Sequence, residues 1–132
     1  DDGARAAREA ALDAPADDPL AAYVEYAAWL EATRPNDALA AFELRERCCR
    51  KFRGDARYAN DARYVACWLA YADRLARPDD AYKFMHKKKI GARVAAFWVG
   101  WALRAEAQGR YKSAAELYDR GAAKAAAPAA SL

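Results

Sequence analysis

The side chains that could carry out chemistry in this chain are few, and their spacing suits neither catalysis nor metal binding. His86 is the only histidine, and the cysteines are Cys48, Cys49 and Cys67. Zinc sites recruit cysteine and histidine in close pairs such as C-x-x-C, and no such pair occurs in the sequence. The glycine-rich phosphate-binding patterns GxxxxGK[ST] and GxGxxG do not occur either. We therefore expect no catalytic residues, no metal site and no cofactor.

Paired carboxylates are the remaining candidates for acid–base chemistry. Glu43 and Glu46 are separated by one helical turn, so a helix would place them on one face. Such pairs are most often solvated surface charges, and we interpret this pair in that way. Cys48 and Cys49 are better explained as small buried apolar residues than as nucleophiles. An odd number of cysteines without a disulfide framework fits a reducing compartment.

The segment HKKKIG, residues 86–91, concentrates positive charge and has two interpretations. Together with Lys83 and Arg93 its lysines could form a phosphate-binding patch, but exposed aromatic residues do not alternate with them. Alternatively, the lysines end a helix, where each gains about 0.3–1 kcal/mol from the helix dipole. Gly91 would then adopt the left-handed conformation that closes the helix, and Ile90 would pack inward. We favour this second interpretation and expect no nucleic-acid partner.

The composition favours one soluble all-α domain. The chain has 132 residues, of which 55% are hydrophobic and 31% charged, and it has only Gly 6 and Pro 5. Its abundant alanine has the highest helix propensity. The net charge of +3 is too small to imply a polyanionic partner. No apolar run approaches the ~20 residues of a membrane span, so we expect no membrane contact. Because residue 1 is not Met, we expect the chain to be part of a longer protein.

Capping residues and prolines divide the chain into about seven helices. The expected helices contain residues 4–12, 19–33, 41–52, 62–76, 80–89, 92–108 and 111–127. The expected caps are Asp18, with Pro19 at the first helical position, Asn36 or Asp37, Asp61 and Asp79. The expected stops are Gly54, Gly91, Gly109 and Pro128.

A repeated pattern, aromatic-x-x-aromatic-Ala, occurs at residues 23–27, 68–72 and 98–102. Its aromatic residues share one helix face, and its alanine allows a neighbouring helix to approach closely. From Trp98 onward the spacing of Ala102, Gly109, Ala114 and Tyr118 is close to that of a tetratricopeptide unit. We therefore predict an all-α, tetratricopeptide-like solenoid of antiparallel helix pairs.

The expected helix 62–76 has an unusually wide apolar surface. Tyr64, Trp68, Tyr71 and Leu75 share one face, and Leu69 extends that face sideways. A helix inside a solenoid needs a wide apolar arc to contact neighbours on two sides. A surplus apolar strip would instead form a groove for a partner peptide. The sequence leaves both explanations open.

Four stretches carry a family resemblance. In order along the chain they are DDPLAAYVEYAAWLEATRP, RYANDARYVACWLAYAD, KKKIGARVAAFWVGWALRAEAQGRY and KSAAELYDRGAAKAAAP. They resemble the N-terminal region of the Bub and BubR (Mad-type) spindle-checkpoint proteins. The resemblance covers roughly residues 17–128, the expected docking domain, with an N-terminal extension at 1–16 and a C-terminal tail at 129–132.

The resemblance implies a non-catalytic module that docks a short amphipathic motif of the KNL-type kinetochore scaffold and recruits the checkpoint protein to kinetochores. It assigns Trp68, Leu69 and Tyr71 to the peptide-binding groove, and Glu46 to a lysine of the docked motif. It also assigns Ile90 and Gly91 to a structural turn. Two positions depart from the family pattern. Ala62 follows Asp61 where proline is common, and Arg50 occupies a position where relatives can have an acidic residue.

The resemblance has further implications for the whole protein. It implies a nuclear, kinetochore and cytoplasmic location, and contacts with other checkpoint proteins through regions outside this chain. Bub-type members also carry a C-terminal Ser/Thr kinase domain, of which this chain contains nothing. The Lys-Glu-Asn degron box is absent here, so binding to the cell-division ubiquitin ligase is not assigned. A half-tetratricopeptide scaffold of an RNA-processing complex is the alternative function.

Overall fold

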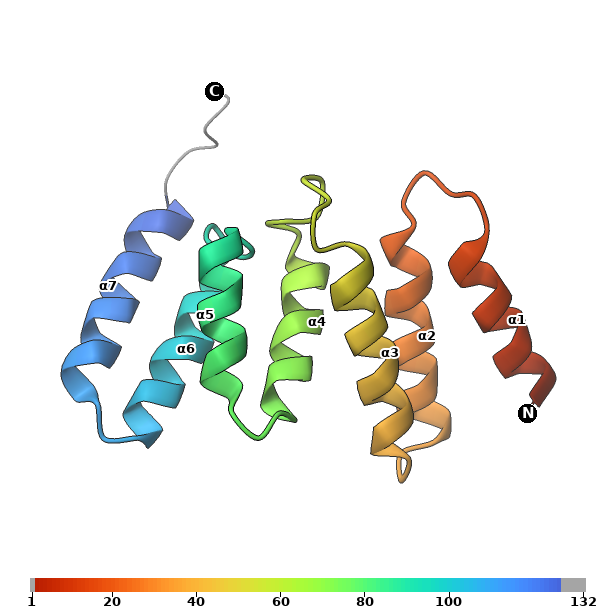
Figure 1. Ribbon diagram of the computed structural model, residues 1–132, viewed down its shortest axis with the longest axis horizontal. Helices are drawn as coiled ribbons and strands as arrows, with labels where there is room; N and C mark the ends of the chain where they lie inside the picture. The colour runs from red at the N-terminus through yellow and green to blue at the C-terminus, as the bar shows by residue number, and fades with distance from the viewer. Residues whose placement is uncertain (1, 127–132) are drawn as a thin grey trace. The chain divides into compact units, whose positions relative to one another are not determined.

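The computed structural model describes residues 2–126, and these residues form seven helices and no strand (Figure 1). The helices are α1 (Asp2–Asp13), α2 (Leu20–Thr33), α3 (Ala38–Lys51), α4 (Ala62–Asp73), α5 (Pro78–Lys88), α6 (Ala95–Ala107) and α7 (Tyr111–Ala126). The predicted all-α class and number of helices are thus confirmed. The chain divides into two compact units, Asp1–Arg53 and Gly54–Leu132.

The first unit contains α1, α2 and α3, with α2 packed against both of the others. Leu12, Leu20, Leu30 and Leu44 are buried in this unit. Tyr23 meets Phe52 edge to face, with ring centres 5.4 Å apart. Ala27, which ends the first copy of the aromatic repeat, is buried, as expected for a close helix contact.

The ends of α2 and α3 differ slightly from the sequence prediction. Pro19 occupies the cap position of α2, one residue later than expected, while the Asp18 carbonyl accepts from Ala21 N–H at 3.1 Å. Asp37 rather than Asn36 caps α3, because its carboxylate accepts from Ala40 N–H at 3.2 Å. The helix α3 ends at Lys51, before the predicted stop at Gly54.

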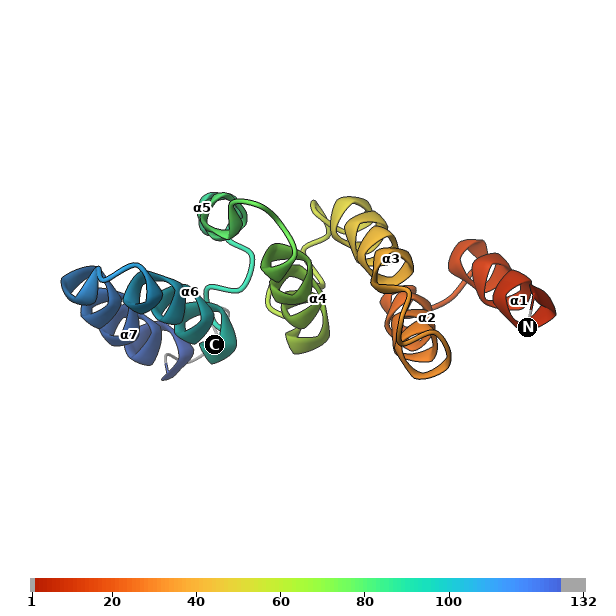
Figure 2. The ribbon, with the colours of Figure 1, turned by 90° about the horizontal axis from the view of Figure 1, so that it is seen from below.

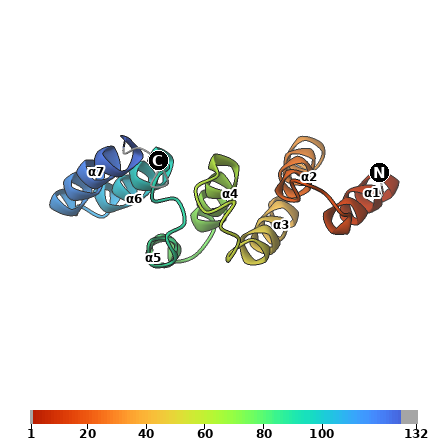
Figure 3. The same ribbon diagram turned by 90° about the horizontal axis from the view of Figure 1, so that it is seen from above.

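The second unit contains α4 to α7, and α6 contacts the other three helices. Figures 2 and 3 show α4, α6 and α7 following one another, with α5 to one side, beside α4 and α6. Ala72 and Ala102, the other two alanines of the repeat, are fully buried. The α6–α7 pair packs most closely at Gly121, where an added Cβ would overlap Trp98 Cβ.

The helix α5 begins and ends differently from the prediction. It starts at Pro78, whose fixed φ and missing N–H suit a first helical position, so Asp79 lies in the first turn and not at the cap. At the other end Lys89, not Gly91, is the residue that follows the helix in the left-handed conformation, with φ 61°. The Lys89 N–H donates to His86 O at 3.2 Å, and the Ile90 N–H donates to Met85 O at 2.8 Å. This pair of bonds is a Schellman closure.

The remaining helix ends are local variations. The helix α4 ends at Asp73, before the expected residue 76, and α6 begins at Ala95 because residues 91–94 form a turn closed by Val94 N–H and Gly91 O. Gly109, with φ 75°, closes α6 as predicted, and Arg110 N–H donates to Ala105 O at 2.9 Å. The predicted stop at Pro128 and the predicted tail at 129–132 lie outside the described residues. Within residues 2–126, no helix has the length and apolar character needed to cross a membrane.

Candidate peptide-docking site

The start of α4 is fixed by Asp61. Its carboxylate accepts from Arg63 N–H at 2.8 Å, and Asp61 Oδ2 also pairs with Arg63 Nη2 at 2.8 Å. The hydrogen bonds from Arg63 hold the pKa of Asp61 below its usual value, so the carboxylate is charged at the positive end of the helix dipole. Ala62 therefore begins the helix without a proline at the first helical position.

The turn at Ile90 and Gly91 holds the loop before α4 against the segment before α6. Gly91 N–H donates to Ala59 O at 2.7 Å, and Arg93 N–H donates to the Asn60 side-chain oxygen at 3.0 Å. Gly91 has φ 87°, and a Cβ there would lie 3.1 Å from Phe97 Cβ, so the position requires glycine. Residues 59–60 and residues 91–93, far apart in the sequence, are thus joined by hydrogen bonds.

The wide apolar face of α4 is used mainly for the core. Tyr64, Val65 and Ala72 are fully buried, and Trp68 is only 6% exposed. Leu69, Tyr71 and Leu75 are half-buried. One part of the apolar face of α4 therefore packs inside the unit, and another part reaches the surface.

Trp68 is the centre of an aromatic cluster across α4 and α5. Its ring stacks on Phe84 with centres 5.4 Å apart, and it meets Tyr71 edge to face at 5.8 Å. Phe84 is half-buried, and Lys88 Nζ lies 5.9 Å from the centre of its ring. We use the name aromatic patch for these three rings together with Leu69, the remaining groove residue that the sequence predicts on α4. The indole N–H of Trp68 is buried and has no hydrogen-bond partner within residues 2–126.

Sequence reasoning did not find Phe84. The spacing of apolar residues along α5 could have indicated Phe84. Ala81, Tyr82 and Met85 form the buried face of this helix, and Phe84 lies beside that face. An aromatic residue at such a position in a short helix indicates a contact with a neighbouring element or a partner.

Glu46, the expected partner for a lysine of the docked motif, lies on α3 in the first unit, whereas the aromatic patch lies in the second. Glu46 Oε1 pairs with Arg50 Nη2 at 3.3 Å; the Arg50 side chain is exposed and the Glu46 side chain is partly exposed. The departure noted at Arg50 thus has a structural consequence, because the arginine neutralises the carboxylate one turn before it.

The part of the chain that the structure describes holds no group of three histidine, cysteine, aspartate or glutamate side chains that could bind a metal ion. Cys48 and Cys49 are buried in α3, and Cys67 is half-buried in α4.

Antiparallel helix pairs with buried alanine contacts define a helical-repeat domain. The chain belongs to the Mad3/BUB1 homology region 1 family, whose model matches residues 4–122. The matched region is this homology region and not a kinase domain.

Curated relatives support the assignment. The chain is 32% identical over 118 residues to the mitotic spindle checkpoint protein BUBR1 of Arabidopsis thaliana. The aligned region covers 88% of this chain and 30% of that protein. It is 29% identical over 113 residues to human mitotic checkpoint serine/threonine-protein kinase BUB1 beta, covering 84% of this chain and 11% of that protein. It is 29% identical over 115 residues to the mitotic spindle checkpoint component mad3 of Schizosaccharomyces pombe, covering 85% of this chain and 37% of that protein. The chain thus spans only a minor part of these relatives.

Solved structures share the fold. A chain in the crystal structure of a mitotic checkpoint complex matches with a TM-score of 0.86 and 26% identity, covering 96% of this chain and 61% of that chain. The crystal structure of the conserved N-terminal domain of the mitotic checkpoint component BUB1 matches with a TM-score of 0.85 at 23% identity, covering 96% of this chain and 69% of that chain.

Proposed function

We propose that this chain is the non-catalytic docking module of a spindle-checkpoint protein, and that its aromatic patch binds a short amphipathic segment of a KNL-type kinetochore scaffold. Docking would recruit the checkpoint protein to kinetochores in mitosis. The observation that carries the proposal is the stack of the buried Trp68 on the half-buried Phe84, flanked by the half-buried Tyr71, where α4 and α5 meet.

The chemistry of the patch suits an apolar peptide face. Aromatic residues supply large contact areas at low entropy cost, and interface residues of this kind typically lose about 2 kcal/mol or more of binding energy on truncation. Leu69 and Tyr71 are half-buried and therefore reachable by a partner before any rearrangement.

The test is a titration of a KNL-type amphipathic peptide into the purified chain and its Leu69→Ala and Tyr71→Ala variants. Each variant should bind about thirtyfold more weakly, which corresponds to about 2 kcal/mol. Tyr111→Ala is the matched control, because Tyr111 is 71% exposed and lies on α7, outside the patch. Its affinity should equal that of the unchanged chain.

Thermal melts of the same proteins separate docking from folding. Trp68→Ala should lose both affinity and stability, because a buried tryptophan typically contributes about 3–5 kcal/mol to folding. Unchanged affinity in both Leu69→Ala and Tyr71→Ala would assign the patch to the core of the unit and reject the proposal.

A further inference from the structure

A pocket of about 140 Å³ lies in the second unit, lined by residues of α5, α6 and α7. We call it the α5–α7 pocket. None of the four residues of the aromatic patch lines it. It is therefore separate from the site of the proposed function, although α5 contributes to both.

The inner wall of the α5–α7 pocket is apolar. Trp101 is half-buried, and Ala105 and Leu117 are buried. An apolar cavity of about 150 Å³ accommodates a molecule the size of benzene. The α5–α7 pocket therefore has room for one leucine- or phenylalanine-sized side chain.

Three cations line the same pocket: Lys83 from α5, Arg120 from α7, and Arg110 just before α7. Within residues 2–126, none of the three forms an ion pair with a carboxylate. Arg110 donates to the side-chain oxygen of Gln108 at 3.3 Å. Arg120 Nη2 lies 3.2 Å from His86 Nε2, and its guanidinium lies 5.0 Å from the centre of the Trp98 ring.

The carboxylates of the pocket do not balance these cations. Asp79 is already engaged, because it accepts from Gln108 Nε2 at 2.7 Å and lies 3.8 Å from Arg104 Nε. Glu116 is the other carboxylate in the lining. Three cations therefore face one available carboxylate, so the lining keeps a positive charge that a ligand can neutralise.

His86 explains how Arg120 is held without a carboxylate. Burial, followed by the nearby charges of Arg120 and Lys124, lowers the pKa of His86. The imidazole is therefore neutral at pH 7, and its Nε2 can accept from the arginine. Arg120 thus keeps its charge and remains available to an anionic partner.

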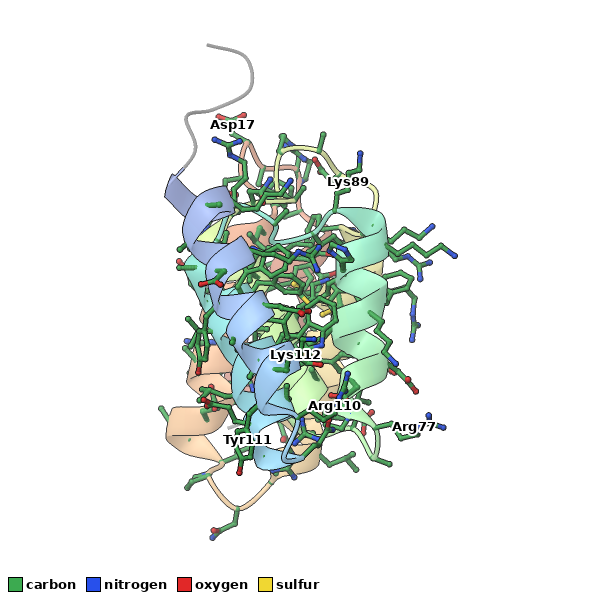
Figure 4. All side chains as sticks on the ribbon, turned by 90° about the vertical axis from the view of Figure 1, so that its left-hand side faces the viewer. Asp17, Arg77, Lys89, Arg110, Tyr111 and Lys112 are labelled. Atoms are coloured by element: carbon green, nitrogen blue, oxygen red, sulfur yellow. The ribbon has the colours of Figure 1, made fainter. Side chains whose placement is uncertain are left out.

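Basic and apolar side chains also lie on the surface next to the pocket. Figure 4 shows Arg110, Tyr111 and Lys112 together at the start of α7. Tyr111 is the most exposed of the large apolar side chains in the described residues. Apolar surface and positive charge thus continue outward from the pocket.

We propose that the α5–α7 pocket binds an acidic peptide segment that inserts one leucine-sized side chain between flanking carboxylates. The apolar wall receives the side chain, and Lys83, Arg110 and Arg120 pair with the carboxylates. A nucleic acid fits less well, because single-strand binding relies on several aromatic rings on which successive bases stack, and the lining contributes one aromatic residue, Trp101.

The proposal is tested with a fluorescent peptide that has one central leucine between two runs of alternating aspartate and glutamate. A second peptide has glycine in place of the leucine, and an oligouridylate serves as the polyanion control. The full chain should bind the leucine peptide saturably, the glycine peptide at least about tenfold more weakly, and the RNA more weakly than the leucine peptide.

Variants locate the binding. Lys83→Glu should weaken binding of the leucine peptide about fivefold, because it reverses one partner of an exposed ion pair. Lys51→Glu is the matched control, since Lys51 is an exposed lysine on α3 in the other unit, and it should leave binding unchanged. Ser113→Phe places a ring at a half-buried position in the lining and should abolish insertion of the leucine. Thermal melts of Ser113→Phe check that the chain remains folded.

Three outcomes would overturn the proposal. The first is no saturable binding of the leucine peptide. The second is equal affinity for the leucine and glycine peptides, or equal losses in Lys83→Glu and Lys51→Glu, either of which would indicate non-specific charge attraction. The third is tighter binding of the RNA that displaces the peptide, which would assign the surface to nucleic acid.

Discussion

The two units each contain a pocket lined by three helices, and the two pockets treat their cations differently. The first unit holds a pocket of about 320 Å³ lined by α1, α2 and α3, which we call the α1–α3 pocket. There, Arg47 makes a bidentate pair with Glu9 at 2.9 and 3.1 Å. The Tyr26 hydroxyl donates to Glu9 at 3.1 Å and accepts from Arg5 Nε at 3.2 Å. Both arginines of the α1–α3 pocket are therefore engaged within the protein.

In the α5–α7 pocket, Arg120 instead contacts a neutral imidazole and an aromatic face, and Lys83 has no carboxylate partner among the described residues. The number of cations in a helical pocket thus says little about ligand binding. What matters is whether a neighbouring helix supplies a carboxylate at the right position, because an arginine already paired must first lose that bond.

The largest effect expected from the comparison of the two units concerns the α6–α7 contact at Gly121. Gly121→Ala forces a Cβ into Trp98 Cβ and should destabilise the chain by about 1–3 kcal/mol through overpacking. The α5–α7 pocket should also lose peptide binding, because α7 must move from α6. The measurement is the urea midpoint. Gly54→Ala is the control, since an added Cβ there meets nothing within 4 Å, and equal midpoints for both variants would contradict the close α6–α7 contact.

The next effect tests the network of the α1–α3 pocket. Tyr26→Phe removes the hydroxyl that links Arg5 to Glu9 and should cost about 1 kcal/mol of unfolding free energy, because the residue is buried. The corresponding change in the second unit, Tyr118→Phe, removes a hydroxyl bonded to Glu106 at 3.1 Å on a half-buried residue and should cost less. A larger loss in Tyr118→Phe, measured by urea denaturation, would reverse the comparison.

A smaller effect concerns acid. The hydrogen bonds from Arg47 lower the pKa of Glu9, so this pair stabilises the fold above the ordinary glutamate pKa of 4.5, and the stabilisation is lost as the pH falls through the lowered value. The pair is partly exposed, so its contribution should be about 0.5 kcal/mol. Between pH 6 and pH 3, the melting temperature should fall less for Glu9→Gln than for the control Glu25→Gln. An equal fall in both variants would show that the pair does not stabilise the fold.

The smallest effect belongs to His86. Its pKa lies below the ordinary value of 6.5, so the unfolded chain binds a proton first and stability falls as the pH drops below about 6.5. This window lies above that of Glu9, so the two groups titrate separately. In thermal melts between pH 7.5 and pH 5, His86→Gln should remove the dependence of the melting temperature on pH. If the melting temperature of this variant still falls as steeply as that of the unchanged chain, another group causes the dependence.

The helices themselves were predictable from the sequence because their causes are local. Alanine content and the spacing of apolar residues gave the all-α class, and Asp37, Asp61 and Gly109 marked helix ends through bonds to residues a few positions away. The misplaced ends also have local causes. Pro78 suits a first helical position better than Asp79 suits a cap, and Lys89 accepts a left-handed conformation because two backbone bonds close the helix around it.

The candidate site was only partly accessible to the sequence. The resemblance to the Bub and BubR proteins directed attention to Trp68, Leu69 and Tyr71, which share one helix. Phe84 was missed because its stacking on Trp68 depends on how α5 crosses α4, and crossing geometry is set by packing rather than by spacing along one helix.

The sequence by itself thus determined the helical class, the approximate position of each helix and the family, since each depends on residues within a turn or on a pattern along the chain. The tertiary structure alone decided which cations are paired and why position 121 requires glycine. It also decided that the loop at Asn60 is hydrogen-bonded to the turn at Gly91. The physical reason is the range of the interactions. Hydrogen bonds, ion pairs and steric contacts act over a few ångströms, so their partners are fixed only when distant helices pack together.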